Sequence, residues 1–511
     1  MQIQVPQFVK YILASFEKAG HEVYVVGGAV RDLLINRNVY DWDFTTNATP
    51  EQILNMFSDG FYDNAFGTVG LVDPKDKKLH EAGKLDQVPV YDLTTFRKEV
   101  GYSDRRHPDH IEWGKTLEED LQRRDFTINA MALKTVISNQ LSVVSKKKER
   151  SRHKIETKNY QLTTKNFELI DYFGGQKDLD NGLIRAVGKP QERFEEDALR
   201  MMRAVRIAAQ LGFVVETTTL DAIQQSARLI DLIAKERISL ELLKILMTDY
   251  PADGIRMLAG TGLMEFIIPE LLSSQGVDQA GHHVDDVWEH SIKSLQKCPS
   301  KDPIIRLATL IHDIGKPFSR AFNCQKCKTR FKQTGSELKC PECGFVNDYF
   351  QSVTFYNHEI VSAKLANKIA NRLRFSNQQR EKLITLVRWH MFSVDERQTD
   401  KAIRRFIRNV GKEYLDDILA VRTGDRLGGG ARETSWRLER FKKKLIEVQK
   451  QPFTVHDLKI TGHEVMVILN LESGPKVGRI LQQLYDEVVE KHLDNDQDIL
   501  LKRLKELDNN Q

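Results

Sequence analysis

Two glycines and two aspartates lie close together in the stretch VVGGAVRDLLINRNVYDWD, residues 25–43. Gly27 and Gly28 follow an apolar run, which predicts a strand that ends in a tight turn where the backbone can approach a phosphate. Asp41 and Asp43 are two positions apart, and a strand directs residues at that spacing to the same face. Such a carboxylate pair suits Mg²⁺ ions that carry a nucleoside triphosphate. Solvated turn acids explain the pair equally well, so the interpretation depends on the rest of the chain.

The length and composition predict several globular domains. The chain has 511 residues, too many for a single hydrophobic core, and 41% of them are hydrophobic and 29% charged. It contains no run of 18 apolar residues, so we expect no membrane-spanning helix. The N-terminus lacks a signal-peptide core, and we expect a cytoplasmic protein. Because the net charge is only +4, any affinity for nucleic acid must come from local patches.

The first part of the chain predicts an α+β domain built on a small mixed sheet. Asp92 alternates with its neighbours in a β-branched stretch and can face the same side as the aspartate pair; a solvated strand face is the alternative. Thr49 is placed to cap a helix, with Gln52 three residues later. The predicted elements are helices over 7–19 and 29–35 and strands over 21–28, 65–72 and 88–97.

Two arginine-rich stretches follow. LEEDLQRRDFTINAMAL, residues 117–133, predicts a helix that leads into Arg124, Asp125 and Asn129. Arginine is suited to bidentate phosphate contacts, and an aspartate or asparagine beside it can bind a ribose hydroxyl. Arg105 and Arg106 lie in a turn-rich loop, where either a phosphate contact or a solvated basic loop fits.

The stretch EEDALRMMRAVRIAAQLGF, residues 195–213, has an apolar stripe typical of a helix. Asp197 and Arg200 are three residues apart, so on one helix they share a face. One acceptor and one forked donor can pair with the edge of cytosine or adenine, as a template strand would. An ordinary surface ion pair is the alternative interpretation.

Taken in order, these motifs resemble those of class II tRNA nucleotidyltransferases, the CCA-adding enzymes. These enzymes share the polymerase-β-like superfamily with bacterial poly(A) polymerases. The resemblance covers at least residues 20–250 and includes VVGGAVRDLL, DWDFTTNATPEQI, YSDRRHP and LEEDLQRRDFTINAMA. It implies that a 3′-hydroxyl attacks the α-phosphate of CTP or ATP with no nucleic-acid template. Poly(A) polymerase, an enzyme that adds only A or only CC, and a chain that is mainly a phosphohydrolase are the alternatives.

The resemblance also implies residue roles. Asp41 and Asp43 would be catalytic and would hold two Mg²⁺ ions. The triphosphate would be cradled by Gly27, Gly28 and Arg31. Further contacts to the incoming nucleotide would come from Arg124, Asp125, Asn129, Glu196, Asp197, Arg200, Arg203 and Arg206, with Glu196, Asp197 and Arg200 reading the base.

Histidines and aspartates recur in predicted helices beyond residue 288. Imidazoles and carboxylates are ligands for divalent metal ions. The set resembles the ligands of HD-superfamily phosphohydrolases, a domain that some bacterial CCA-adding enzymes carry, and implies a metal-dependent hydrolytic site; a scaffold without activity is the alternative. The expected ligands are His290, His312, Asp313, His358, His390 and Asp425.

Four of the five cysteines form two C-x-x-C pairs in CQKCKTRFKQTGSELKCPECGF. Two such pairs with a short spacer predict a zinc ribbon with structural Zn²⁺, whereas a redox role would need two adjacent dithiols. The fifth cysteine, Cys298, has no partner in the pattern. The ribbon either braces the HD site or adds a basic RNA contact. The predicted zinc ligands are Cys324, Cys327, Cys340 and Cys343.

The expected domains are a nucleotidyltransferase head, a helical neck, an HD-type domain with the ribbon inserted at 321–347, and a helical tail. Lys476 follows a Gly-Pro pair that opens a tail helix expected to face the tRNA elbow. A basic insert, 139–166, is either an RNA contact or a solvated loop.

The expected partners are the tRNA acceptor stem and elbow, CTP and ATP, and the sequence carries no signal for an oligomeric state. The domain boundaries are 1–175, 176–270, 271–430 and 431–511.

Overall fold

The computed structural model places the N-terminal and C-terminal parts of the chain in two units, Met1–Pro269 and Glu270–Gln511, which we describe separately. The loop with Arg105 and Arg106 and the insert 139–166 lie outside the described residues. None of the described helices is both long and apolar enough to cross a membrane. The structure describes residues 5–62, 68–82, 84–85, 88–100, 110–135, 167–279, 285–392, 394–395, 397–449, 455–489 and 493–508.

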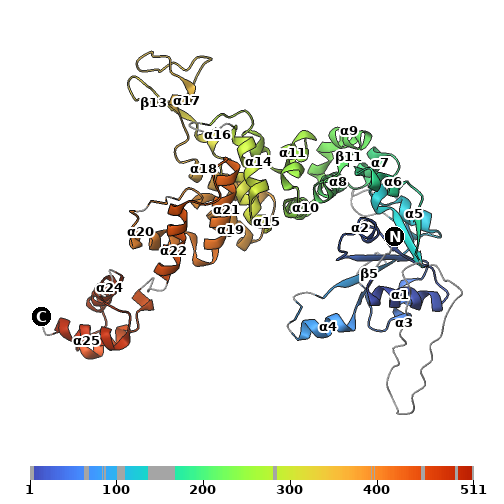
Figure 1. The fold of residues 1–511 in the computed structure, drawn as a ribbon, viewed down its shortest axis with the longest axis horizontal. Coiled ribbons are helices and arrows are strands. Elements are labelled where there is room, and N and C mark those ends of the chain that lie inside the picture. The colour runs from blue at the N-terminus through green and yellow to red at the C-terminus, as the bar shows by residue number, and fades with distance from the viewer. Residues whose placement is uncertain are drawn as a thin grey trace, which may run out of the picture. The chain divides into compact units, whose positions relative to one another are not determined.

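The mixed sheet that the sequence predicts is present in the N-terminal part of the first unit, where it has seven strands (Figure 1). Its order is β3-β4-β5-β2-β1-β8-β9. The pair β2–β5 is parallel and the other neighbouring pairs are antiparallel. The strands are β1 (Val23–Val26), β2 (Trp42–Thr46), β3 (Phe61–Tyr62), β4 (Thr68–Val72), β5 (Val90–Thr95), β8 (Met131–Thr135) and β9 (Phe167–Asp171).

Short apolar elements build the core around this sheet. All four residues of β1 are buried, and α1 (Gln7–Lys18) buries one face made by Val9, Ile12, Leu13 and Phe16. β1 is shorter than predicted because Gly27, at a φ of 75°, turns the chain into α2 (Gly28–Leu34). The predicted capping box is present, with Thr49 and Gln52 at the start of α3 (Pro50–Met56).

Helices dominate the rest of the first unit. They are α4 (Pro74–Glu81), α5 (Leu117–Gln122), α6 (Gly175–Asp180), α7 (Pro190–Glu196), α8 (Leu199–Leu211), α9 (Thr217–Ser226), α10 (Lys235–Met247), α11 (Pro251–Gly260) and α12 (Met264–Ile267), with 3₁₀ turns η1 (Thr127–Asn129) and η2 (Ala227–Leu232). A hairpin of β6 (Arg97–Val100) and β7 (His110–Trp113) and a parallel pair, β10 (Leu183–Ile184) with β11 (Val214–Val215), complete the unit.

The predicted continuous helix over 195–213 is wrong at its start. α7 ends at Glu196 and α8 begins at Leu199, with Asp197 extended between them at φ −143° and ψ 103°. The Asp197 carboxylate accepts a hydrogen bond from the backbone N–H of Leu199 (3.1 Å). Aspartate favours such local bonds over a continuous helix, so it breaks the chain into two helices here.

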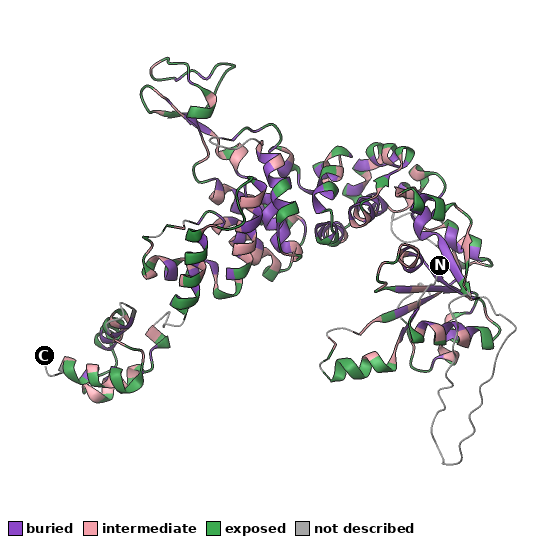
Figure 2. Ribbon diagram, in the orientation of Figure 1, coloured by how far each residue is buried: buried purple, intermediate pink, exposed green. Residues whose placement is uncertain are grey.

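The second unit is a helical bundle with a small sheet beside it. Its buried positions concentrate in the bundle (Figure 2). The sheet has the order β13-β12-β14 and is antiparallel. The elements are α13 (Pro269–Leu272), α14 (Val287–Lys297), α15 (Pro303–Ile311), α16 (Lys316–Ser319), β12 (Ala321–Asn323), β13 (Arg330–Phe331), α17 (Tyr349–Ser352), β14 (Val353–Thr354), α18 (His358–Arg372), α19 (Asn377–Trp389), α20 (Asp400–Val410), η3 (Lys412–Tyr414), α21 (Leu415–Gly428) and α22 (Trp436–Gln449).

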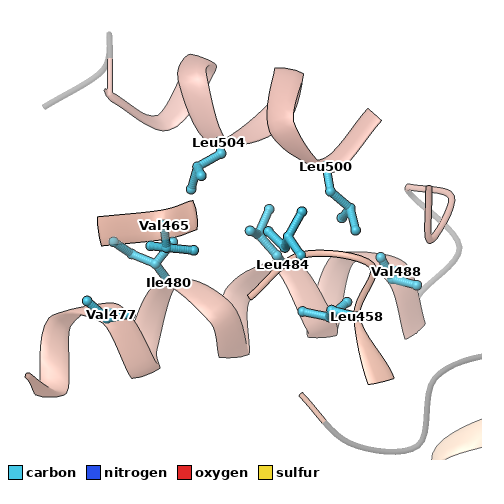
Figure 3. Close-up of a cluster of buried hydrophobic side chains, with 9 residues drawn as sticks. Leu458, Val465, Val477, Ile480, Leu484, Val488, Leu500 and Leu504 are labelled. Carbon is cyan, nitrogen blue, oxygen red and sulfur yellow. The ribbon is translucent and has the colours of Figure 1, made fainter. Parts of the chain in front are cut away.

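The C-terminal helices have an apolar cluster of their own (Figure 3). They are η4 (Val455–Asp457), α23 (Gly462–Ile468), α24 (Pro475–Val489) and α25 (Gln497–Asp508). α24 opens at Pro475, as predicted, and Lys476 is exposed in its first turn. The cluster consists of Leu458, Ile460, Val465, Val477, Ile480, Leu484, Val488, Leu500 and Leu504.

Candidate functional site

The turn after β1 brings a glycine, a carboxylate and a guanidinium together. A Cβ added to Gly27 would lie 3.0 Å from Nη1 of Arg124 and 3.2 Å from Oδ2 of Asp43. A side chain at this position would therefore intrude on both groups. Gly28 is the first residue of α2. A Cβ added to it would lie 3.5 Å from Nη2 of Arg31.

Asp41, Asp43 and Asp92 lie on or beside the neighbouring strands β2 and β5. Asp43 lies in β2, and Asp41 is exposed just before the strand. β2 and β5 run parallel with Asp43 opposite Asp92. Residues opposite each other in register point to the same face of a sheet. Asp92 therefore lies on the same face as Asp43, as its alternation in the sequence suggests.

Burial raises the pKa of Asp43 above its ordinary value, and the nearby charge of Asp41 raises it further, while Arg124 acts in the opposite direction. These acids therefore lie where an added positive charge would be favourable. Carboxylate oxygens are the donors that Mg²⁺ prefers. The residues present thus fit the predicted Mg²⁺ ions.

A chain of polar contacts links α2 to α8. Arg31 donates from Nε to Asp32 (2.8 Å) and from Nη1 to Asn129 Oδ1 (3.0 Å). Asn129 in turn donates from Nδ2 to Asp125 Oδ1 (3.2 Å). Nη2 of Arg203, on α8, lies 2.8 Å from Asp125 Oδ2. The structure thus places four predicted nucleotide-binding residues in one connected network.

Asp125 is ionised within this network. Burial opposes ionisation of the Asp125 carboxyl, but the charge of Arg203 and the hydrogen bond from Asn129 outweigh burial, and the pKa is lowered from its ordinary value. The acid therefore remains an acceptor at neutral pH. It anchors Arg203 of α8 to the turn that follows α5.

Asp120 is a site residue that sequence reasoning missed. It is fully buried in α5, and its carboxylate lies 2.8 Å from Nη2 of Arg123 and 3.6 Å from Nη2 of Arg124. Burial opposes its ionisation, but these two arginines outweigh burial and lower the pKa of Asp120. The Asp-x-x-Arg-Arg spacing, three and four residues on a helix, is the signal that could have identified it.

The structure gives Asp197 and Arg200, two of the three predicted base-reading residues, separate partners, and not the ion pair with each other that was the alternative interpretation. Nη1 of Arg200 contacts Glu196, and its Nη2 donates to the backbone carbonyl of Arg123 (3.3 Å). Asp197 instead pairs with Arg237 of α10, whose Nη2 lies 2.8 Å from Oδ2. Because Asp197 lies in the break between α7 and α8, the two residues do not share a helix face.

Arg206 is placed differently from Arg203. Its Nε donates to Glu241 Oε1 of α10, and Glu241 is buried. This contact joins α8 to α10. Of the two arginines, Arg203 is the one with a contact to Asp125.

In the second unit, all six predicted HD residues converge. Nε2 of His312 lies 3.2 Å from Asp313 Oδ2, and Nε2 of His358 and of His390 lie 3.1 and 3.6 Å from Asp313 Oδ1. Across the cluster, Nε2 of His290 lies 3.2 Å from Asp425 Oδ1. α14, α15, α18, α19 and α21 supply or adjoin these side chains.

The imidazoles are oriented in a common way. Nδ1 of His312, His358 and His390 lies 2.7, 2.9 and 2.8 Å from the backbone carbonyl three residues earlier. A ring that donates from Nδ1 presents Nε2 as a lone pair, which is the form that binds metals. Nε2 of His358 and Nε2 of His390 are buried and face Asp313 Oδ1, so that in each case the lone pair of a ring nitrogen faces a carboxylate oxygen. The donor set therefore fits divalent metal.

Asp313 is shared by two groups of ligand atoms. One group is His290, His312 and Asp313, and the other is Asp313, His358 and His390, with the atoms of each group within 4.8 Å of one another. Burial opposes ionisation of Asp313, yet His312 and Lys316 hold its pKa well below the ordinary value.

The four ribbon cysteines also cluster as predicted, with their sulfurs within 4.8 Å of one another. Sγ of Cys324 lies 3.5 Å from Sγ of Cys343, and Sγ of Cys327 lies 3.6 Å from Sγ of Cys340. These separations are too long for disulfides and suit four thiolates around one Zn²⁺. Cys298 is buried elsewhere in the bundle, where it accepts a hydrogen bond from Thr309.

Three family models match successive parts of the chain. Residues 23–185 match the poly A polymerase head domain. Residues 212–274 match the RNA- and SrmB-binding site of polymerase A. Residues 351–504 match tRNA nucleotidyltransferase domain 2.

Curated relatives and solved structures are named CCA-adding enzymes. The protein of Limosilactobacillus reuteri is 40% identical over 50% of this chain and 53% of its own, so the matched part spans about half of that relative. The protein of Leuconostoc mesenteroides is 28% identical over 98% of this chain and 96% of its own. The Bacillus stearothermophilus enzyme in complex with CTP covers 99% of both chains, with a TM-score of 0.65 and 23% identity. The chain is thus similar to CCA-adding enzymes in sequence and fold.

Proposed function

We propose that this chain is a CCA-adding tRNA nucleotidyltransferase, which adds C, C and A to tRNA 3′ ends from CTP and ATP. The observation that carries the proposal is the convergence of Gly27, Asp43 and Arg124 at one end of the sheet. Glycine leaves room for a phosphate, the carboxylate suits a metal-bound triphosphate, and the guanidinium suits its negative charge. The named relatives support the same activity.

The reaction is attack of the tRNA 3′-hydroxyl on the α-phosphate, which releases pyrophosphate. Asp41 and Asp43 would hold Mg²⁺, which when bound neutralises charge on the phosphates. Arg31 and Arg124 would orient the triphosphate from either side of the glycine turn. Asp125, held ionised by Arg203, would accept a hydrogen bond from the ribose.

Base selection would come from the junction of α7 and α8. Arg200 offers a fork of donors, fixed at one end by Glu196. Asp197 offers acceptors, fixed by Arg237. Because Arg200 and Asp197 are each held by a separate partner, the two side chains can present a fixed pattern of hydrogen-bond donors and acceptors to the edge of a base. Structures titled as complexes with CTP, ATP and tRNA among the similar proteins support these partners.

One experiment separates this function from its alternatives. A tRNA that ends before CCA is incubated with CTP, with ATP and with both, and the product ends are sequenced. A CCA-adding enzyme yields CC with CTP alone and CCA with both nucleotides. Long A tracts would identify a poly(A) polymerase instead, and addition of A only to tRNA-CC would identify an A-adding enzyme.

A second activity, metal-dependent phosphohydrolysis, is proposed for the HD cluster. The buried Nε2 atoms of His358 and His390 favour it over a scaffold role, because ring lone pairs that face the Asp313 carboxylate repel it unless a cation lies between them. A bound divalent metal would polarise a phosphoryl oxygen. Lys316, 2.6 Å from Asp313 Oδ2, would place a positive charge beside the substrate phosphate. The test measures hydrolysis of a 2′,3′-cyclic nucleotide with Mn²⁺, Ni²⁺ or Mg²⁺. Hydrolysis should occur with metal and should be absent after chelation.

A further inference from the structure

The zinc ribbon is inserted between two parts of the HD cluster. It leaves the bundle after α16, which carries Lys316, and returns just before His358 at the start of α18. Its base is the antiparallel pair β12–β14, in which Phe322 lies opposite Val353. Cys324, the first zinc ligand, directly follows β12. Both ends of the ribbon are therefore within a few residues of the HD cluster.

Phe355 joins the ribbon to the HD cluster. Its side chain packs against the buried apolar cluster of the ribbon. Its backbone carbonyl lies 2.9 Å from Nδ1 of His358, and its ring centroid lies 5.9 Å from Nζ of Lys316. The members of that apolar cluster are Phe322, Cys324, Phe331, Leu338, Cys340 and Val353.

His358 and Lys316, which Phe355 contacts, lie against different oxygens of the Asp313 carboxylate. Nε2 of His358 lies 3.1 Å from Asp313 Oδ1, and Nζ of Lys316 lies 2.6 Å from Asp313 Oδ2. Nζ of Lys316 also lies 2.6 Å from Gln279 Oε1. A displacement of Phe355 would therefore change both sides of Asp313.

A further contact ties the ribbon to the same place. Tyr349, on α17, packs against the ribbon cluster, and its hydroxyl donates to the carbonyl of Asp278 (3.3 Å). Asp278 is the neighbour of Gln279, the partner of Lys316. The ribbon thus contacts the surroundings of Lys316 on two sides.

A segment of this size cannot keep its shape without its metal. Two of the six cluster members are zinc-ligand cysteines, and the ribbon strands are only two or three residues long. So little apolar surface does not offset the entropy of ordering the chain, and zinc binding supplies the missing free energy. Loss of zinc should therefore release the apolar cluster that holds Phe355.

We propose that zinc in the ribbon controls metal binding at the HD cluster, with Phe355 as the positioning residue between them. The zinc-bound ribbon fixes the Phe355 carbonyl and ring, which orient His358 and Lys316 about Asp313. Without zinc, the HD cluster binds its metal weakly and nucleotide transfer is unaffected. This inference rests on the proposed HD function.

The test uses the full-length protein and two variants that act at different points. Cys327→Ser removes one zinc ligand, and Phe355→Ala keeps all four cysteines but removes the packing. Zinc is measured by elemental analysis. Mn²⁺ affinity of the HD cluster is measured by calorimetry as the part of the binding that Asp313→Asn abolishes, which separates it from binding at Asp41 and Asp43. Substitution of groups that orient metal ligands typically costs about 10–100-fold in affinity. We expect a weakening of that size in both variants, with zinc retained in Phe355→Ala.

Ser336→Ala, an exposed position in the ribbon, is the matched control and should keep zinc and Mn²⁺ affinity. CCA addition is assayed in parallel to show that the rest of the chain is intact. Unchanged Mn²⁺ affinity in the zinc-free Cys327→Ser protein would overturn the coupling alone. A wild-type protein that binds no Mn²⁺ at the HD cluster, including Asp313, His358 and His390, would overturn the HD assignment and the coupling together.

Discussion

Arg203 of α8 lies 2.8 Å from the buried carboxylate of Asp125, although the two residues are 78 positions apart in the chain. The contact joins the helix that carries Arg200 to the turn that follows α5. Asn129 continues the path to Arg31. The residues proposed to bind the triphosphate and those proposed to select the base are therefore connected through one buried acid.

Replacing Arg203 with leucine should destabilise the protein in a pH-dependent way. The folded-state pKa of Asp125 is lowered, so this acid contributes stability above its unfolded pKa of about 4, and that contribution is lost as the pH falls through the folded pKa. We expect a loss of about 1–3 kcal/mol in unfolding free energy near neutral pH, and a smaller difference below about pH 4.

Arg203 is partly exposed and Arg200 adds a second positive charge near Asp125, so the lower part of this range is expected. Urea unfolding from pH 3 to 8 measures the effect. Arg203→Lys, which keeps the charge, is the matched control. A loss that is the same at every pH would contradict the role assigned to the ion pair.

Asp43→Asn should abolish nucleotide transfer and leave hydrolysis at the HD cluster intact. The carboxylate is proposed to hold metal that stabilises the transition state by several kcal/mol, which corresponds to at least about a thousandfold in rate. Single-turnover addition of CMP to tRNA measures the loss. Transfer that persists in Asp43→Asn would refute the assignment of the site.

Asp120→Asn should weaken nucleotide binding although Asp120 is not proposed to touch the nucleotide. It removes the charge that holds Arg124 beside Gly27. We expect an increase of about tenfold in KM for CTP and ATP, which corresponds to about 1.4 kcal/mol, with a smaller change in kcat, because the ion pair that orients Arg124 is lost. A change in kcat alone would show that Asp120 does not position Arg124.

Arg200→Gln should impair the choice of base more than triphosphate binding. The substitution removes the guanidinium fork but leaves Gly27, Arg31 and Arg124 in place. Incorporation of CMP, AMP and UMP at each position of the tRNA end gives the selectivity, which we expect to fall by about tenfold or more. Arg228→Gln, at an exposed position of η2, is the matched control. Unchanged selectivity in Arg200→Gln would exclude the template role.

Asp313→Asn should remove metal-dependent hydrolysis completely, and His390→Ala only in part. Asp313 belongs to both groups of ligand atoms, whereas His390 belongs to one. Metal content and cyclic phosphodiesterase activity are measured together, with CCA addition as the internal control. Equal losses in the two variants would argue against two groups that share one carboxylate.

Much of the site was predictable because its parts are local. The glycine turn before α2, the Thr49 capping box, the carboxylates around β2 and the two C-x-x-C pairs depend on spacings of a few residues. Such spacings fix which side chains lie together on one turn or one strand. The HD cluster was predicted from its resemblance to a family, and the structure brings its residues together.

Which distant partners pair was decided by the tertiary structure. The sequence predicted that Asp197 and Arg200 share one helix face, but Asp197 breaks the helix and pairs with Arg237, and Arg200 pairs with Glu196. Ion pairs between distant residues depend on how helices pack, and the sequence contains several arginines of equal suitability. The sequence by itself therefore determined the chemistry of the glycine turn and of the cysteine pairs. Only the packing of α8 against α10 and against the turn after α5 decided which acids Arg203 and Arg206 meet.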